Sequence, residues 1–134
     1  MYEGTMNDEL ESLLISGKEI DRKMVAEVLA PYLRIDKETL DIRPLGNWGE
    51  VKAYNKILLY LLARKAMKAL GLGIEDESSS ATEIMQKTGL KKGTVNPALR
   101  ILFDGRVVAQ DKERRYSIPN HAIEEAKNLI NEGK

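Results

Sequence analysis

The chain has 134 residues, of which 43% are hydrophobic and 31% charged, and it contains no cysteine. This composition indicates a soluble globular protein with one sizeable core, and it excludes a disulfide framework, a thiolate zinc site and a cysteine nucleophile. The first ten residues lack the basic and apolar regions of a signal peptide. The most apolar run, residues 57–63, is too short to cross a bilayer. We therefore expect a cytoplasmic protein that makes no membrane contact.

The net charge is zero, with 21 basic and 21 acidic residues, but the charges are unevenly distributed. Residues 80–134 hold 10 basic and 7 acidic side chains, whereas residues 1–79 hold 11 basic and 14 acidic ones. Residues 86–116 hold eight basic side chains against three acidic ones. This local excess predicts that an anionic partner would bind that segment.

Residues 1–46 predict two helices followed by a β-hairpin. The first helix is capped by Thr5 or Asn7 and ends at Ser16, and the second is capped by Asp21 and ends near Ala30. Period-two alternation then predicts two strands, 32–36 and 40–43, whose shared faces carry Leu33 with Ile35 and Leu40 with Ile42.

A long helix is predicted over residues 48–70. Asn47 and Glu50 have the spacing of a capping box, and Trp48 is expected to staple the start of the helix. Residues 57–63 are apolar all round, which predicts that the helix is buried on more than one side. We expect it to pack on the following helices and on the N-terminal helices or a second copy of the chain. Residues 75–79 are predicted to form a solvated linker.

Residues 80–118 predict two helices and a second hairpin. Ser80 and Glu83 form a capping box, and Gly89 is a C-cap. The next helix turns an apolar stripe inward and leaves its polar residues outward; the stripe comprises Val95, Leu99 and Leu102. Two strands, 107–110 and 114–118, then flank a polar turn at residues 111–113.

A last amphipathic helix follows Asn120, its predicted N-cap, and ends near Asn131. Its apolar stripe comprises Ala122, Ile123, Ala126, Leu129 and Ile130. The stripe either packs on the core of its own chain or forms an interface with a second copy, and the pattern alone does not separate these alternatives.

The order of helix, turn, helix and hairpin resembles the winged helix-turn-helix family. Within that family it is similar to PadR- and MarR-like transcriptional regulators. We expect the protein to be an archaeal member of the family. The segment TVNPALRILFDGRVV, residues 94–108, resembles their passage from recognition helix to wing, including the proline. We therefore expect a mainly α fold with small β-hairpins (α+β): an extension at 1–46, a winged-helix domain at 47–118 and a terminal helix at 119–134.

The resemblance implies a homodimer that binds double-stranded DNA, with the second helix in the major groove and the hairpin on the backbone or minor groove. The implied DNA-binding residues are Lys91, Lys92, Thr94, Asn96, Arg100, Lys112, Arg114 and Arg115. Lys91 and Lys92 oppose the helix dipole, which phosphate contact would explain, although they also fit a solvated surface. Thr94 could instead cap the helix, and Asn96 with Pro97 could restart or kink it.

No residue pattern points to catalysis, a cofactor or a metal. His121 is the only histidine, and it has no second imidazole or cysteine to complete a metal site. We therefore expect a protein that is not an enzyme. Two alternatives to DNA binding are open: a winged helix that contacts another protein, and a regulator whose effector pocket involves Trp48 and Tyr32.

Overall fold

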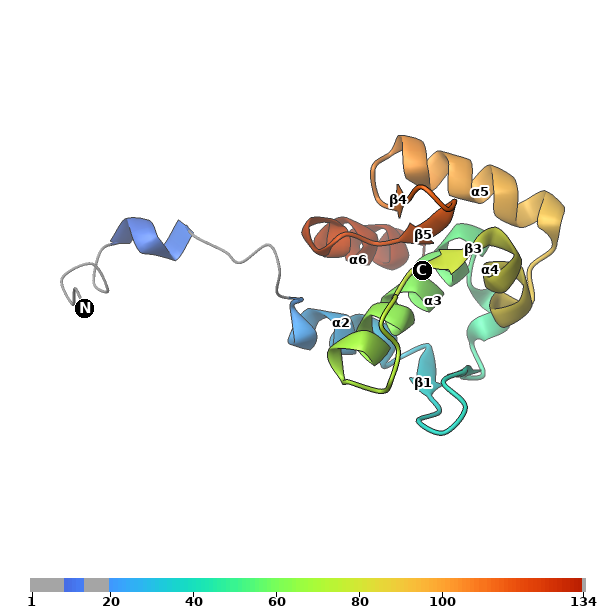
Figure 1. The fold of residues 1–134 in the computed structure, drawn as a ribbon, viewed down its shortest axis with the longest axis horizontal. Helices are drawn as coiled ribbons and strands as arrows, with labels where there is room; N and C mark the ends of the chain where they lie inside the picture. The colour runs from blue at the N-terminus through green and yellow to red at the C-terminus, as the bar shows by residue number, and fades with distance from the viewer. Residues whose placement is uncertain (1–8, 14–19, 134) are drawn as a thin grey trace.

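The central element of the fold is α3 (Ala53–Ala69), around which the other helices pack (Figure 1). The computed structural model describes residues 9–13 and 20–133. It is an α+β structure, as the sequence predicted, with α5 along one edge of the molecule and the first hairpin near the opposite edge. The remaining elements are η1 (Glu9–Leu13), α2 (Arg22–Leu29), β1 (Leu33–Ile35), β2 (Ile42–Pro44), η2 (Trp48–Glu50), β3 (Ser79–Ser80), α4 (Ala81–Thr88), α5 (Lys92–Asp104), β4 (Ala109–Gln110), β5 (Arg115–Ser117), η3 (Asn120–Ala122) and α6 (Ile123–Glu132).

The middle of α3 is buried all round, as its sequence predicted. Every residue from Ile57 to Ala63 is buried. Helices α2, α4, α5 and α6 all contact α3, so both of its sides are covered within one chain. This arrangement removes the need for a second copy to cover the central helix.

The start of α3 differs from the prediction. Asn47 makes no capping hydrogen bond, because its φ and ψ of −86° and 3° lie outside the extended region that an N-cap adopts. Trp48–Glu50 forms a separate 3₁₀ turn, and Val51 is extended before α3 begins at Ala53. Trp48 therefore does not staple α3, although its ring lies 5.7 Å from the Lys56 ammonium.

The first hairpin forms as predicted, with one correction. Asp21 caps α2 through the backbone N–H of Met24, and the antiparallel strands then pair Ile35 with Ile42. Leu40 was predicted to share a strand face with Ile42. It lies instead in the turn with a φ of 61°, so the second strand starts two residues later.

The second sheet contains a strand that the sequence analysis missed. Its order is β3-β5-β4, with both pairs antiparallel. The segment predicted as a solvated linker over residues 75–79 ends in buried residues, since Ser78 and Ser79 are both covered and Ser79 begins β3. The Tyr60 hydroxyl lies 2.9 Å from the Ser79 hydroxyl and holds this strand on α3.

The last helix folds back on its own core. Ala122, Ile123, Ala126 and Ile130 are buried, and α6 contacts α2 and α3. Asn120 does not cap this helix as predicted, because a 3₁₀ turn precedes α6 and the Asn120 side chain accepts a hydrogen bond from Lys65. The apolar stripe of α6 is therefore already occupied within one chain.

Two further results concern the described part of the chain. Of the first predicted helix, the structure describes only residues 9–13, and the rest of that prediction lies outside the described residues. None of the helices within residues 9–13 and 20–133 has the length and apolar character needed to cross a membrane. The same residues contain no cluster of three potential metal ligands.

Candidate nucleic-acid interface

Helix α4 is fixed at both ends by the residues that the sequence indicated. The Ser80 hydroxyl accepts the Glu83 N–H at 3.2 Å, and the Glu83 carboxylate accepts the Ser80 N–H at 2.9 Å. Gly89 ends the helix with a φ of 80°, a left-handed conformation that costs glycine little. These two ends set the angle at which the chain enters α5.

Helix α5 has one buried and one exposed face. Val95, Leu99 and Leu102 are buried, as predicted, and Ala98 joins them. These side chains pack against α3 and α4. The opposite face of this 13-residue helix is therefore presented to solvent over a length of about 20 Å.

The predicted DNA-binding residues of α5 and its N-cap are all exposed to solvent: Lys91, Lys92, Thr94, Asn96 and Arg100. Lys91 occupies the N-cap position without a side-chain capping bond, and no acidic residue lies in the first turn. Thr94 is inside the helix and does not cap it, contrary to the alternative prediction. The positive end of the helix dipole thus carries two cations, which favours an anion near this end.

Pro97 does not restart or interrupt α5. The helix runs continuously from Lys92 to Asp104 with the proline inside it. Proline has no N–H to offer the carbonyl four residues earlier, which belongs to Gly93. Both residues are exposed, so water can satisfy that carbonyl. Asn96 consequently projects from the middle of an uninterrupted helix, where its amide is free of a capping role.

The turn of the second hairpin is organised by Asp111. Its carboxylate accepts the backbone N–H groups of Glu113 and Arg115, each at 2.9 Å. Arg114 adopts a φ of 61°, an uncommon value for a residue other than glycine, asparagine or aspartate. The side chains of Lys112 and Arg114 are exposed at the tip of this turn. Asp111 therefore acts within the turn, and the two cations remain at its surface.

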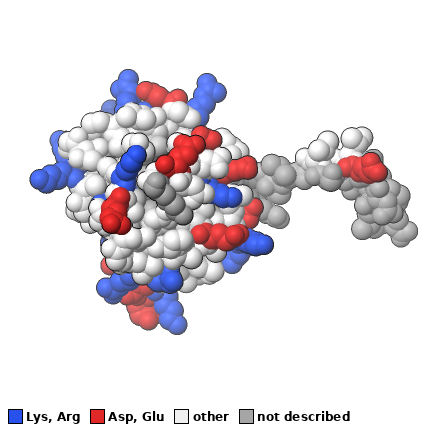
Figure 2. All heavy atoms as spheres, turned by 180° about the vertical axis from the view of Figure 1, so that it is seen from behind, with Lys and Arg blue, Asp and Glu red and all other residues white. Residues whose placement is uncertain are grey.

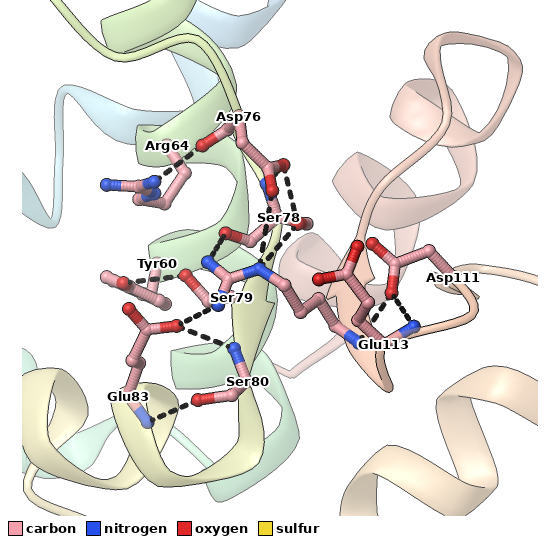
Figure 3. Close-up of polar contacts among 10 residues, drawn as sticks. Tyr60, Arg64, Asp76, Ser78, Ser79, Ser80, Glu83, Asp111 and Glu113 are labelled. Atoms are coloured by element: carbon pink, nitrogen blue, oxygen red, sulfur yellow. Dashed lines mark hydrogen bonds and ion pairs between the residues drawn. The ribbon is translucent and has the colours of Figure 1, made fainter.

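Arg115 has a different environment from its neighbour, because its guanidinium binds three residues that are labelled in Figure 3: Asp76, Ser78 and Glu83. Its guanidinium lies 2.9 Å from the Glu83 carboxylate and 3.3 Å from that of Asp76. It also donates to the Ser78 carbonyl at 2.8 Å and to the Ser78 hydroxyl at 3.1 Å. Adjacent residues of a strand face opposite sides of the sheet, so only one of the two arginines can face a groove. The geometry assigns the inward role to Arg115 and leaves Arg114 outside.

The pKa values of the carboxyl groups around Arg115 are lowered. For Asp76, hydrogen bonds from the Ser78 hydroxyl and N–H are the main cause, and the nearby Arg115 and Arg64 charges add to them. For Glu83, burial alone would raise the pKa, but the Ser80 N–H and the Arg115 charge more than offset it. Both groups are thus held in the charged form that binds the arginine.

A hollow of about 370 Å³ lies between α5 and the hairpin, and sequence reasoning did not anticipate it. Its wall includes Asn96 and Arg100 from the helix, with Gln110 and Tyr116 from the strands. The Gln110 amide donates to the Tyr116 hydroxyl at 3.1 Å, because the two residues are directly opposed in the strand register. Had this strand register been predicted, Gln110 and Tyr116 would have been included among the candidate DNA-binding residues.

One cavity contains only one of the two residues suggested for an effector pocket. Tyr32 lines a cavity of about 340 Å³ at the start of α3 and the end of α6, whereas Trp48 is not part of its wall. This cavity is lined by α3, α6 and the segments around them, and no residue of the second hairpin contributes to it. This cavity therefore does not bring Tyr32 and Trp48 together in the wall of one pocket.

The charges elsewhere on the molecule are mixed. On the face shown in Figure 2, acidic and basic side chains are interspersed around uncharged surface. Lys87, which contributes to the basic count of residues 86–116, forms an ion pair with Asp41. Arg100 lies 3.4 Å from Asp104, with both side chains exposed. The cations of α5 and of the hairpin turn are thus the candidate anion-binding groups. No family model, curated protein or solved structure matches this chain.

Proposed function

We propose that this chain is a winged helix-turn-helix DNA-binding protein, a cytoplasmic transcriptional regulator that acts as a homodimer. The exposed face of α5 would enter the major groove, and the tip of the second hairpin would contact the backbone or minor groove. One observation carries the proposal: Lys92, Asn96 and Arg100 are exposed on the same helix whose other face is fully buried.

The chemistry of these side chains suits the two kinds of contact that DNA requires. Lys91, Lys92, Lys112 and Arg114 are cations at exposed positions, which is what phosphate binding needs. Asn96 can form a bidentate hydrogen bond with adenine, and Arg100 with guanine. Arg115 is not part of the proposed surface, because its guanidinium already binds Glu83 and Ser78.

Fluorescence anisotropy with a labelled duplex at two salt concentrations tests the proposal. Binding should weaken steeply as salt rises, because phosphate contacts release counterions. A Lys92→Ala/Arg100→Ala variant should bind more weakly, and its salt slope should fall by about one for each phosphate-binding cation that is removed. Absence of binding to any duplex at low salt would rule the proposal out.

A matched control removes the same charge elsewhere. Lys37 and Lys68 are exposed, and neither lies on α5 or the second hairpin. A Lys37→Ala/Lys68→Ala variant should keep the wild-type affinity and salt slope. Equal weakening in both double variants would indicate non-specific attraction to net charge rather than a defined interface.

A second candidate function is contact with another protein through the same helix. Ile101 is 63% exposed and Phe103 is 44% exposed, and both lie near the C-terminal end of α5. Apolar side chains of this size at the surface favour a protein contact. The apolar faces of α3 and α6, where such a contact was expected, are buried. An Ile101→Ser/Phe103→Ser variant that keeps DNA affinity but loses a co-purifying protein would support this second function.

A further inference from the structure

An apolar groove runs along α2 and the C-terminal end of α3. Figure 1 shows these two segments well away from α5. We call it the α2 groove; its lining includes Val25, Ala26, Leu29, Ile35, Ala69 and Leu70. Its volume is about 470 Å³, and a second hollow of about 220 Å³ shares three of its residues and extends it toward β1. Leu70 remains 56% exposed at its edge. The fold thus leaves an uncovered apolar channel at this surface.

The rim of the α2 groove is basic. Arg22 and Lys23 line the larger hollow, and Arg34 lines the smaller one. Arg22 donates to the Ala69 carbonyl at 3.0 Å and Arg34 to the Ala30 carbonyl at 2.6 Å. Within residues 9–13 and 20–133, the ion pairs involve none of these three cations. The rim therefore has positive charge available for an acidic partner.

The N-terminal part of the chain has the complementary properties. Leu10 and Leu13 belong to η1, where a spacing of three places them on one side, and they are 69% and 74% exposed. Residues 1–17 contain four acidic side chains and no lysine or arginine. We call residues 9–13 the N-terminal arm. It offers two apolar side chains within an acidic segment, which is the chemistry that the α2 groove would accept.

We propose that the N-terminal arm of one copy docks in the α2 groove of a second copy, and that the exchange is mutual. In a single chain the two leucines and the groove are exposed at the same time, although Ile20, seven residues beyond Leu13, already lines the groove. A two-fold exchange covers both arms and both grooves at once, which is the low-cost route to a dimer. The stripe of α6 is occupied internally, so this surface replaces it as the dimer contact.

Light scattering during size-exclusion chromatography of the full chain tests the exchange. The wild type should form a dimer, and a Leu10→Ser/Leu13→Ser variant should dimerise at least about tenfold more weakly. Ala26→Glu should have the same effect, because it places an exposed carboxylate in the groove lining. Tyr54→Ser removes an exposed apolar residue outside both the arm and the groove and should leave the dimer intact. A wild type that is monomeric at all concentrations, or a dimer unaffected by the arm and groove variants, would overturn the proposal.

Cysteine cross-linking separates exchange from docking within one chain, since the protein has no cysteine of its own. Leu13→Cys and Ala26→Cys are prepared as two separate single variants, each verified as folded by circular dichroism. Mixed and oxidised, they should form a disulfide-linked heterodimer. If instead the mixture forms none, while a variant carrying both cysteines closes a disulfide within the monomer, the arm occupies its own groove and the proposal is wrong. The readout requires no DNA, so a failure of the exchange is distinguishable from a failure of DNA binding.

Discussion

The Arg115 guanidinium lies 2.9 Å from the carboxylate of Glu83, the residue that closes the capping box of α4. The same carboxylate oxygen accepts the Ser80 N–H. One ion pair therefore joins the start of α4 to the second hairpin, and Ser78 adds two hydrogen bonds to the same guanidinium. The hairpin is held beside the helices by this contact, which fixes where its exposed tip lies relative to α5.

The two adjacent arginines should consequently respond in opposite ways to mutation. Arg115→Gln should lower the free energy of unfolding by about 1–3 kcal/mol, because it removes charge-assisted hydrogen bonds from a largely covered side chain. Arg114→Asn keeps a residue that tolerates positive φ and removes only an exposed charge. It should leave stability unchanged and weaken DNA binding. Urea denaturation and fluorescence anisotropy on both variants measure the two effects, and a reversed pattern would contradict the assignment.

Stability should fall in acid because several carboxyl groups have lowered pKa values in the folded state. The hydrogen bond from Arg43 is the main cause that lowers the pKa of Asp36 to about 2. The pKa values of Asp76 and Glu83 are also below their usual range. A carboxyl group whose folded pKa lies below its unfolded value stabilises the fold fully above the unfolded pKa. That contribution is lost as the pH falls through the folded pKa.

The urea midpoint should therefore be flat near neutral pH and should decline below about pH 5. An Asp76→Asn/Glu83→Gln variant should be less stable at neutral pH and should show a shallower decline, since two of the titrating groups are gone. Denaturation curves at intervals between neutral pH and acid provide the comparison. An unchanged slope in the variant would show that other groups control the acid transition.

Local signals in the sequence predicted the elements whose ends depend on neighbouring residues. Asp21, Ser80 and Gly89 act as caps within their own turns, and all three positions are confirmed. The inward stripe of α5 was equally predictable, because its apolar residues recur at helical spacing within one helix and are buried. The outward face of the candidate interface followed directly from that stripe.

Where prediction was wrong, tertiary contacts outweighed a local signal. Asn47 and Asn120 both had cap-like positions, but neither caps a helix, and Asn120 binds Lys65, which lies 55 positions earlier in the chain. Ser78 and Ser79 looked like solvated linker, yet they are buried because Arg115 and Tyr60 bind them from other elements. No spacing within a segment encodes partners so distant in sequence, so the third strand and the role of Arg115 required the structure.

Removing one or the other partner of the ion pair between Lys65 and Glu77 should lower the stability of the fold by different amounts. The Lys65 ammonium lies 2.7 Å from Glu77, and only 4% of the Lys65 side chain is exposed against 21% for Glu77. Glu77→Ala leaves a buried charge without its counter-ion and should cost up to about 3 kcal/mol. Lys65→Met leaves a carboxylate that water can reach and should cost clearly less. Thermal denaturation of both variants tests the order, and a larger destabilisation by Lys65→Met would contradict it.

Asn55 should be replaceable with a gain in stability. Its side chain is 2% exposed, and its Oδ1 atom has no hydrogen-bond partner in the part of the chain that the structure describes. Leaving such a group unpaired costs about 1–3 kcal/mol, and an apolar residue of similar shape avoids that cost. Asn55→Leu should therefore raise the melting temperature. The exposed Asn47 supplies a control, because Asn47→Leu has no buried orphan atom to remove and should bring no such gain.

Pro97 offers the second opportunity to stabilise the fold, this time at the candidate interface. Pro97→Ala restores an N–H that can bond to the Gly93 carbonyl, and it replaces a poor helix residue at an exposed position of α5. The free energy of unfolding should rise by about 1–3 kcal/mol. Pro31→Ala is the matched control, since Pro31 lies in an exposed turn after the end of α2 and not inside a helix. Pro31→Ala should give no gain in stability, because its main effect is to raise the conformational entropy of the unfolded chain.

Urea denaturation measures the free energy of unfolding of both variants. Slower amide exchange in α5 of the Pro97→Ala protein should accompany the gain. A decrease in the stability of that protein would mean that the proline relieves a strain that an unbroken hydrogen-bond ladder would impose on α5.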